Sequence, residues 1–100
     1  MKGGQNLMRV RIYATLRELL ETSAVELKLE QTMTAGEALE RLVERFPVLD
    51  GKLWDADRVL TGYVMVLLNG RSIEWLQGLA TLVTDDDALA LFPPVGGGDE

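Results

Sequence analysis

The chain has 100 residues, of which 47% are hydrophobic, and a net charge of −6. This length predicts a single domain with one hydrophobic core. Because cysteine and histidine are both absent, the sequence excludes disulfides, thiolate metal sites, a cysteine nucleophile and a histidine general base. An acidic surface repels phosphate backbones, which argues against nucleic-acid binding and favours a protein partner with a basic face.

The distribution of apolar residues argues against a membrane partner. No apolar run approaches the length of about 18 residues that a membrane-spanning helix needs. The N-terminal stretch MKGGQNL lacks the apolar core of a secretory signal. We therefore expect a cytoplasmic protein.

Two strands are predicted in the first third of the chain. Residues 1–7 are polar and glycine-rich, so we expect a disordered leader there, and Met8 is a candidate for the natural start. Apolar and polar residues alternate over residues 8–14 and again over residues 25–29, which is typical of strands with one buried face. The intervening residues 16–21 indicate a short helical turn or a loop.

A helix is predicted over residues 34–46. Thr34 and Glu37 have the spacing of a capping box, in which each side chain bonds the backbone amide of the other residue. Pro47 ends the helix, because proline disfavours helical geometry at the residue before it. We expect the helix to cover one face of a sheet through an apolar stripe that contains Leu39, Leu42, Val43 and Phe46.

Three more strands are predicted after this helix. Residues 63–68 are almost continuously apolar, which is typical of a central strand buried on both faces. Asn69-Gly70 predicts a tight turn, and residues 72–73 form a short return strand. The last strand is predicted over residues 88–92.

The connections in this half are predicted to be irregular. Residues 48–62 favour no regular element, and residues 85–87 form an acidic turn. Three adjacent carboxylates do not converge on one ion as the ligands of a calcium loop do, so we predict no metal site there. Trp54 and Trp75 are interpreted as packing residues.

This order of elements predicts an α+β protein, with one main helix packed on one face of a mixed sheet. The ubiquitin-like β-grasp is the simplest such arrangement, and it places the first and last strands side by side and parallel at the centre. We expect the β-grasp domain to occupy residues 8–95, followed by a flexible glycine-rich tail over residues 96–100.

Several segments together resemble the MoaD/ThiS family of sulfur carriers. They are MRVRIYATLRE at residues 8–18, the helix that ends in Phe46-Pro47, VLLNG at residues 66–70, the acidic turn, and LFPPVGGG at residues 91–98. The resemblance covers nearly everything after residue 7. Its most specific part, Phe-Pro-Pro-Val before the glycines, points to the small subunit of molybdopterin synthase, MoaD, more than to the thiazole-pathway carrier.

The resemblance implies a carrier whose final glycine is the reactive group. A MoeB-like enzyme of the ubiquitin-activating type would use ATP to adenylate the Gly98 carboxylate, and sulfur would then replace AMP to give a thiocarboxylate. In the MoaD branch the tail inserts into a MoaE-like large subunit. No permanently bound cofactor and no metal are implied.

The composition of the tail suits this chemistry. Gly97 and Gly98 have no Cβ, so they can pass through a slot too narrow for other residues. Pro93 and Pro94 fix φ and lack amide donors, so they hold the tail extended and away from the sheet.

Asp99 and Glu100 depart from the family pattern. Members of this family end on a glycine pair, and alignment through Phe-Pro-Pro-Val places that pair at Gly97 and Gly98. The two extra residues enclose the functional carboxyl in a peptide bond, which cannot be adenylated as a carboxylate can. We therefore expect a processing peptidase to remove them.

Some of these residues are also predicted to contact partners. By pattern alone Phe92 fits the core and an interface equally well, and the resemblance favours the interface. Arg17 matches an arginine that the family uses in a salt bridge to a partner. The predicted partner contacts are Arg17, Phe92, Pro93, Pro94, Val95 and Gly96.

Two other functions are compatible with the sequence. The first is a ubiquitin-like modifier that is joined through Gly98 to lysines of other proteins. The second is a non-conjugating β-grasp binding module that keeps Asp99 and Glu100. The mass of the cellular protein separates the second from the others, because only the binding module retains both acids.

Overall fold

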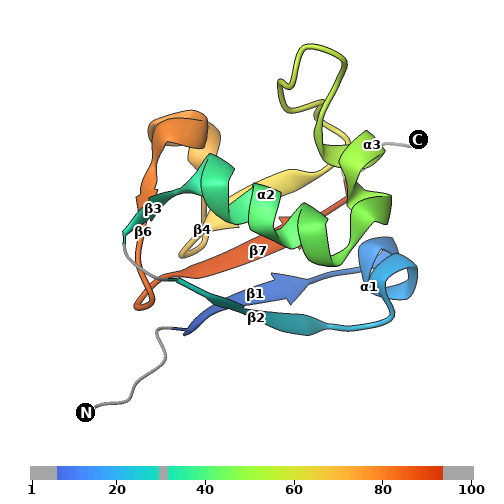
Figure 1. Ribbon diagram of the computed structural model, residues 1–100, viewed down its shortest axis with the longest axis horizontal. Helices are drawn as coiled ribbons and strands as arrows, with labels where there is room; N and C mark the ends of the chain where they lie inside the picture. The colour runs from blue at the N-terminus through green and yellow to red at the C-terminus, as the bar shows by residue number, and fades with distance from the viewer. Residues whose placement is uncertain (1–6, 30–31, 94–100) are drawn as a thin grey trace.

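A mixed five-stranded sheet forms the framework of the protein (Figure 1). The computed structural model describes residues 7–29 and 32–93. The sheet order is β2-β1-β7-β4-β5, with β1 and β7 parallel and every other pair antiparallel. The strands are β1 (Leu7–Ile12), β2 (Ala24–Lys28), β4 (Met65–Leu68), β5 (Arg71–Ser72) and β7 (Ala88–Phe92). The predicted β-grasp, with adjacent parallel first and last strands, is therefore confirmed.

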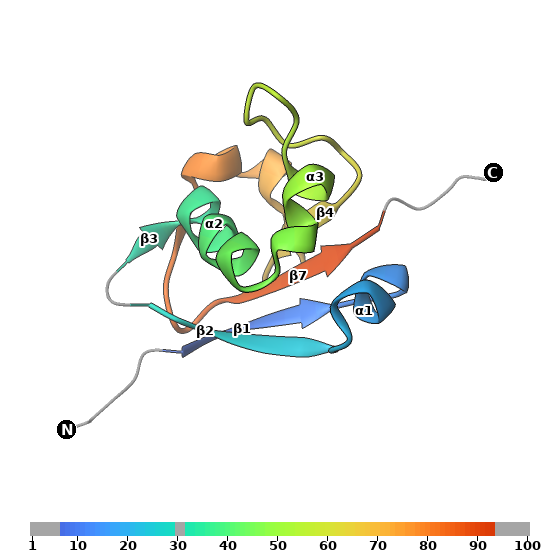
Figure 2. The same cartoon turned by 45° about the vertical axis from the view of Figure 1, so that its right-hand side comes forward.

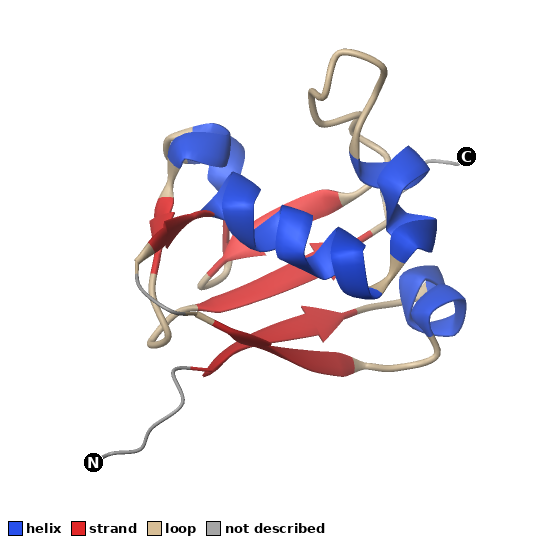
Figure 3. Cartoon of the chain, viewed as in Figure 1, coloured by secondary structure: helices blue, strands red, loops and turns tan. Residues whose placement is uncertain are grey.

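The main helix, α2 (Ala35–Arg45), lies across one face of this sheet (Figure 3). Its capping box is present: the Glu37 amide donates to the Thr34 hydroxyl oxygen at 3.1 Å, and the Thr34 amide donates to the Glu37 carboxylate at 2.9 Å. Leu39 and Leu42 are fully buried, and Val43 and Phe46 pack partly buried against the same core. The predicted contact face of the helix is therefore confirmed.

Shorter elements complete the fold. Helix α1 (Thr15–Leu20) follows β1, so of the two predicted alternatives, a helical turn or a loop, the structure has the helix. Strands β3 (Met33–Thr34) and β6 (Leu82–Val83) form a separate antiparallel pair. These strands are too short to show a sequence period, and the sequence did not predict them. The other short helical segments are η1 (Pro47–Leu49), α3 (Asp50–Leu53), η2 (Ile73–Trp75) and η3 (Gly78–Ala80).

The prediction that residues 63–68 are buried on both faces is wrong. Val66 and Leu68 face the core, whereas Tyr63 is 66% exposed and Met65 is 41% exposed. Among the described residues, α2 and α3 lie on the same side of the sheet and no helix covers the other side (Figures 1 and 3). The apolar residues of this segment are therefore divided between the buried core and the exposed surface.

Three smaller predictions also need correction. Trp54 is buried as expected, but Trp75 is 82% exposed at the end of η2 and does not pack in the core. The connection predicted over residues 48–62 contains helical turns at its start, where η1 begins at Pro47 and α3 follows it. Leu7, which was predicted to lie in the leader, belongs to β1; the rest of the predicted leader, residues 1–6, and the predicted tail, residues 96–100, lie outside the described residues.

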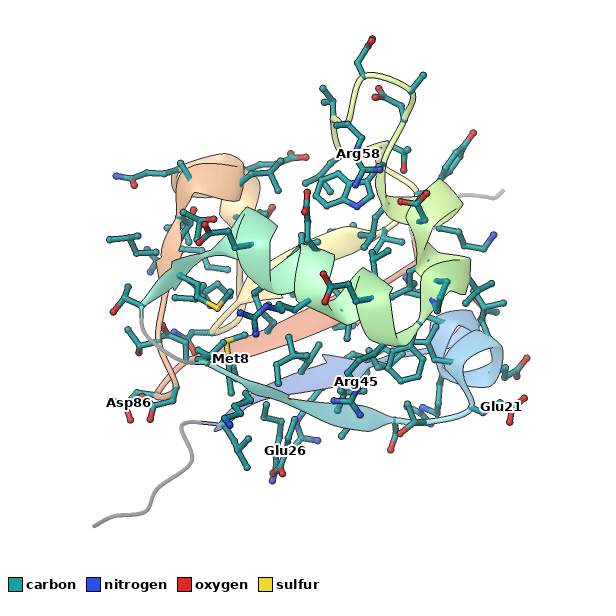
Figure 4. All side chains as sticks on the ribbon, in the orientation of Figure 1. Met8, Glu21, Glu26, Arg45, Arg58 and Asp86 are labelled. Carbon is teal, nitrogen blue, oxygen red and sulfur yellow. The ribbon has the colours of Figure 1, made fainter. Side chains whose placement is uncertain are left out.

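A projecting loop follows α3 and is held at its base by Arg58 (Figure 4). The Arg58 guanidinium lies 3.0 Å from the Asp50 carboxylate and 3.8 Å from that of Glu40. It also lies 5.1 Å from the centre of the Trp54 ring, a cation–π distance.

Within the parts of the chain that the structure describes, no helix is long and apolar enough to cross a bilayer.

Candidate partner-docking surface

The base of the predicted tail lies at one end of the central strands. Because β1 and β7 run parallel, β7 ends beside the start of α1, which follows β1 (Figure 2). The Tyr13 amide donates to the Leu91 carbonyl at 3.1 Å and fixes this end of the pair. Pro93 is the last described residue, so the predicted site residues Pro94, Val95, Gly96, Gly97 and Gly98 lie outside the described part.

Phe92 lies on the side of the sheet away from α2. Along β7, Leu89 and Leu91 are buried in the core, whereas Ala90 and Phe92 alternate with them and are half-buried on the opposite side. Phe92 is therefore not a core residue beneath α2. This position is compatible with its predicted role in partner binding.

Tyr13 stacks on Phe92 and was not among the predicted site residues. The two ring centroids are 4.3 Å apart and the rings are parallel to within 1°. The alternation in the first strand placed Tyr13 on the polar face. The signal that could have identified it is an aromatic residue on that face, in the strand predicted to lie next to Phe92.

The two rings form part of a larger apolar area. On β4, Met65 pairs with Phe92 and Leu67 pairs with Ala90, so the side chains of both β4 residues lie on the same side as Phe92. We call the side of the five-stranded sheet away from α2 the open face. Its apolar centre consists of Tyr13, Met65, Leu67, Ala90 and Phe92. Because exposed apolar patches can mark interaction surfaces, this centre is a candidate for partner contact.

A groove of about 450 Å³ opens beside the base of the tail. It lies between α1, α3 and the segment before β4, and its walls are largely apolar. Lys52 is its one charged lining residue among those described. The lining residues are Thr15, Leu16, Leu19, Lys52, Tyr63 and Pro93. The groove therefore adjoins Pro93, at the base of the tail, and offers a second apolar surface beside the apolar centre of the open face.

Arg17 is exposed on α1, near this groove. The first turn of α1 is closed by the Arg17 amide, which donates to the Ala14 carbonyl at 2.9 Å. Within residues 7–29 and 32–93, the Arg17 guanidinium makes no ion pair. It is therefore available to a partner carboxylate, and its predicted role in a partner salt bridge stays a prediction.

The acidic turn before β7 has a structural role. The Asp87 carboxylate accepts from the Thr84 amide and from the Asn69 side chain, both at 2.8 Å, and Asn69 in turn accepts from the Ala88 amide at 2.9 Å. Partial burial raises the pKa of Asp87, but the hydrogen bonds from Asn69 and Thr84 outweigh it and hold the pKa below its ordinary value. This network joins the β4–β5 turn to the start of β7.

Comparison with known proteins assigns the family. The profile of the ThiS family matches residues 10–98. The chain belongs to the ThiS family. The match runs through the candidate docking surface and reaches Gly98, so it confirms both the resemblance to the MoaD/ThiS sulfur carriers and the ubiquitin-like β-grasp fold.

Proteins similar in sequence to this ThiS-family chain include small archaeal modifier proteins. Small archaeal modifier protein 3 of Haloferax volcanii is 35% identical over 91 residues, which cover 91% of this chain and 98% of that protein. The crystal structure of small archaeal modifier protein 1 from the same organism has a TM-score of 0.80 and 33% identity, and covers 92% of this chain and 99% of that one. A chain of the BexX/CysO complex of Amycolatopsis orientalis has a TM-score of 0.74 and 25% identity, covering 91% and 99%.

Proposed function

We propose that this protein is a ubiquitin-like carrier that is activated at the carboxylate of Gly98. The observation that carries this proposal is the family match, which extends from residue 10 through Gly98. The half-buried aromatic pair of Tyr13 and Phe92 at the base of the tail supports it, because an activating enzyme must bind the domain while the tail reaches its ATP site.

Activation is a transfer reaction in which the chain is the substrate. A carboxylate oxygen of Gly98 attacks the α-phosphorus of ATP and forms a new O–P bond. The bond between the α-phosphorus and the bridging oxygen breaks, and pyrophosphate leaves with that electron pair. The resulting acyl adenylate carries AMP as its leaving group.

The second step decides what the carrier delivers. Hydrosulfide that displaces AMP, with loss of a proton, leaves a thiocarboxylate, whereas a lysine amine that displaces AMP, with loss of a proton, leaves an isopeptide bond. Related proteins at 33–35% identity are named as modifiers, which favours delivery to lysines of other proteins.

The small subunit of molybdopterin synthase is a second candidate function. The run from Phe92 to Val95, followed by glycines, resembles the MoaD branch of the family. In this role the tail inserts into a MoaE-like large subunit and donates sulfur there. Binding to such a subunit, measured with a chain that ends at Gly98, separates this role from protein conjugation.

Both functions require removal of Asp99 and Glu100. A peptide bond at Gly98 is not a nucleophile toward ATP, and two extra carboxylates would enter the channel that admits a glycine pair. We therefore include a processing peptidase among the partners, together with a MoeB-like adenylating enzyme. The intact mass of the protein from its own cells tests this step, and retention of both acids would contradict it.

ATP–pyrophosphate exchange tests the proposed activation directly. The assay uses the adenylating enzyme from the same organism with two chains, one ending at Glu100 and one ending at Gly98. We expect exchange only with the shorter chain. A Gly97→Val variant of the shorter chain is the matched control, because it keeps the free carboxylate but adds bulk next to it. If neither chain is activated, the carrier function is wrong and the binding-module alternative replaces it.

A further inference from the structure

Arg11 is an exposed cation with small neighbours on the open face. It lies on β1, where its register partners are Ala24 on β2 and Ala90 on β7. Within residues 7–29 and 32–93, its guanidinium makes no hydrogen bond and no ion pair. Two alanines leave the guanidinium accessible from outside the sheet.

Arg9 lies on the same strand and face as Arg11 and carries the same charge, but its environment differs. It pairs with Glu26 across the β1–β2 ladder, at 3.8 Å between charged atoms. Glu26 projects from β2 on the side away from α2 (Figure 4). The charge of Arg9 is therefore already compensated within the chain, whereas the charge of Arg11 is not.

The surroundings of Arg11 are apolar toward β7 and the end of β1, whereas the paired residues Arg9 and Glu26 lie on its other side. Tyr13 is the next residue along β1 on this face, and Phe92 is the next along β7 after Ala90. Leu67 lies beyond Ala90 on β4. Glu26 is the one acid among the strand residues of the open face, and it is paired with Arg9. Within residues 7–29 and 32–93, Arg11 and Lys28 are the cations of this face that make no ion pair, and Lys28 lies toward the opposite end of β2. In a chain of net charge −6, Arg11 therefore places an unpaired positive charge beside the apolar centre.

We propose that Arg11 determines partner specificity by binding an Asp or Glu carboxylate set within an apolar surface of the adenylating enzyme. This inference rests on the proposed function and names the chemistry of its docking partner. The guanidinium presents a planar fork that matches a carboxylate with two parallel hydrogen bonds. When a partner covers the apolar centre, it displaces water from the Arg11 guanidinium. A partner surface without a carboxylate at this position would leave the Arg11 charge buried and unpaired. The cost of burying that charge weakens binding to such partners.

The test uses the chain that ends at Gly98 and the adenylating enzyme from the same organism. ATP–pyrophosphate exchange is measured against carrier concentration for the wild type, Arg11→Ala, Arg11→Glu, Arg11→Lys and the matched control Arg9→Ala. We expect KM to rise about tenfold for Arg11→Ala and about a hundredfold for Arg11→Glu, as expected for loss and reversal of a charged hydrogen-bonded pair. Arg11→Lys should recover part of the loss, and Arg9→Ala should stay within about twofold.

The chemical step and the fold serve as separate readouts. Because Arg11 does not touch the reacting carboxylate, kcat should be unchanged in all variants. Thermal melts should also coincide for the wild type and Arg11→Ala, since an exposed unpaired charge adds little stability. The wild-type KM should rise more steeply with salt than that of Arg11→Ala.

Three results would overturn the proposal. A wild-type KM for Arg11→Glu would show that no carboxylate faces this residue. Equal losses for Arg9→Ala and Arg11→Ala would show a general effect of charge on the face. If the wild-type chain itself is not activated, both the proposed function and this inference are wrong. In the other two outcomes the wild-type chain is activated, so only this inference is wrong.

Discussion

Ala14 joins β1 to α1 in a backbone conformation that favours glycine. Its φ is 57° and its ψ is −135°, a combination that an L side chain adopts only at a cost. Such residues cost about 1–3 kcal/mol, whereas a glycine substitution loses about 0.4–1 kcal/mol through the unfolded chain. Ala14 is exposed, so its methyl group contributes little burial. We therefore expect Ala14→Gly to raise the free energy of unfolding by about 1 kcal/mol, with a rise in Tm of about 4–8 °C.

Urea unfolding followed by tryptophan fluorescence measures this change. Trp54 is buried and Trp75 is largely exposed, so the signal reports mainly the loss of structure around Trp54. Ala24→Gly is the matched control: Ala24 is also exposed, but it lies within β2, where glycine costs about 0.5–1 kcal/mol. If both glycine variants are destabilised to the same extent, the strain assigned to Ala14 is absent.

Other predictions concern the core, the docking surface and the acidic turn. Leu42→Ala should lower the free energy of unfolding by about 2–5 kcal/mol, because the side chain is fully buried; a wild-type urea midpoint would contradict this. Phe92→Ala should weaken binding to the adenylating enzyme by about 2 kcal/mol or more in calorimetry, and unchanged affinity would remove Phe92 from the interface. Arg17→Ala should slow association in stopped flow more than it lowers Tm, since an exposed charge acts mainly through steering. Asp87 has a lowered folded pKa, so it stabilises the fold above its unfolded pKa of about 4, and this contribution is lost as pH falls through the folded value. Asp87→Asn should therefore flatten the decline of Tm in acid.

Sequence reasoning succeeded where one period continued over many residues. The alternation in the first strand and the apolar stripe of α2 each involve several positions that agree, so they predicted both the elements and their buried faces. The turn at Asn69-Gly70 was also predicted, because a tight turn imposes its own residue preferences. Local physics therefore accounts for most of the framework.

The failures concern surfaces that depend on distant parts of the chain. The apolar run that ends at Leu68 reads as buried on both sides, but burial of the second side requires a covering element that is not coded within the run. Trp75 is also apolar and yet 82% exposed, at the end of η2. Tyr13 became part of the candidate site only through its contact with Phe92, which lies at the opposite end of the sequence. Such contacts follow from topology and not from local pattern.

The order of strands in the sheet has a consequence for biosynthesis. β7 pairs with β1 on one side and with β4 on the other, so the centre of the sheet is supplied by residues that the ribosome adds after all the other strands. Until residues 88–92 are made, the five-stranded sheet is divided into the β1–β2 hairpin and the β4–β5 pair, and an isolated hairpin is marginally stable in water. A chain cut short before β7 cannot assemble the domain and is exposed to proteases. Only chains that have been translated through β7, at the base of the tail, can therefore complete the five-stranded sheet.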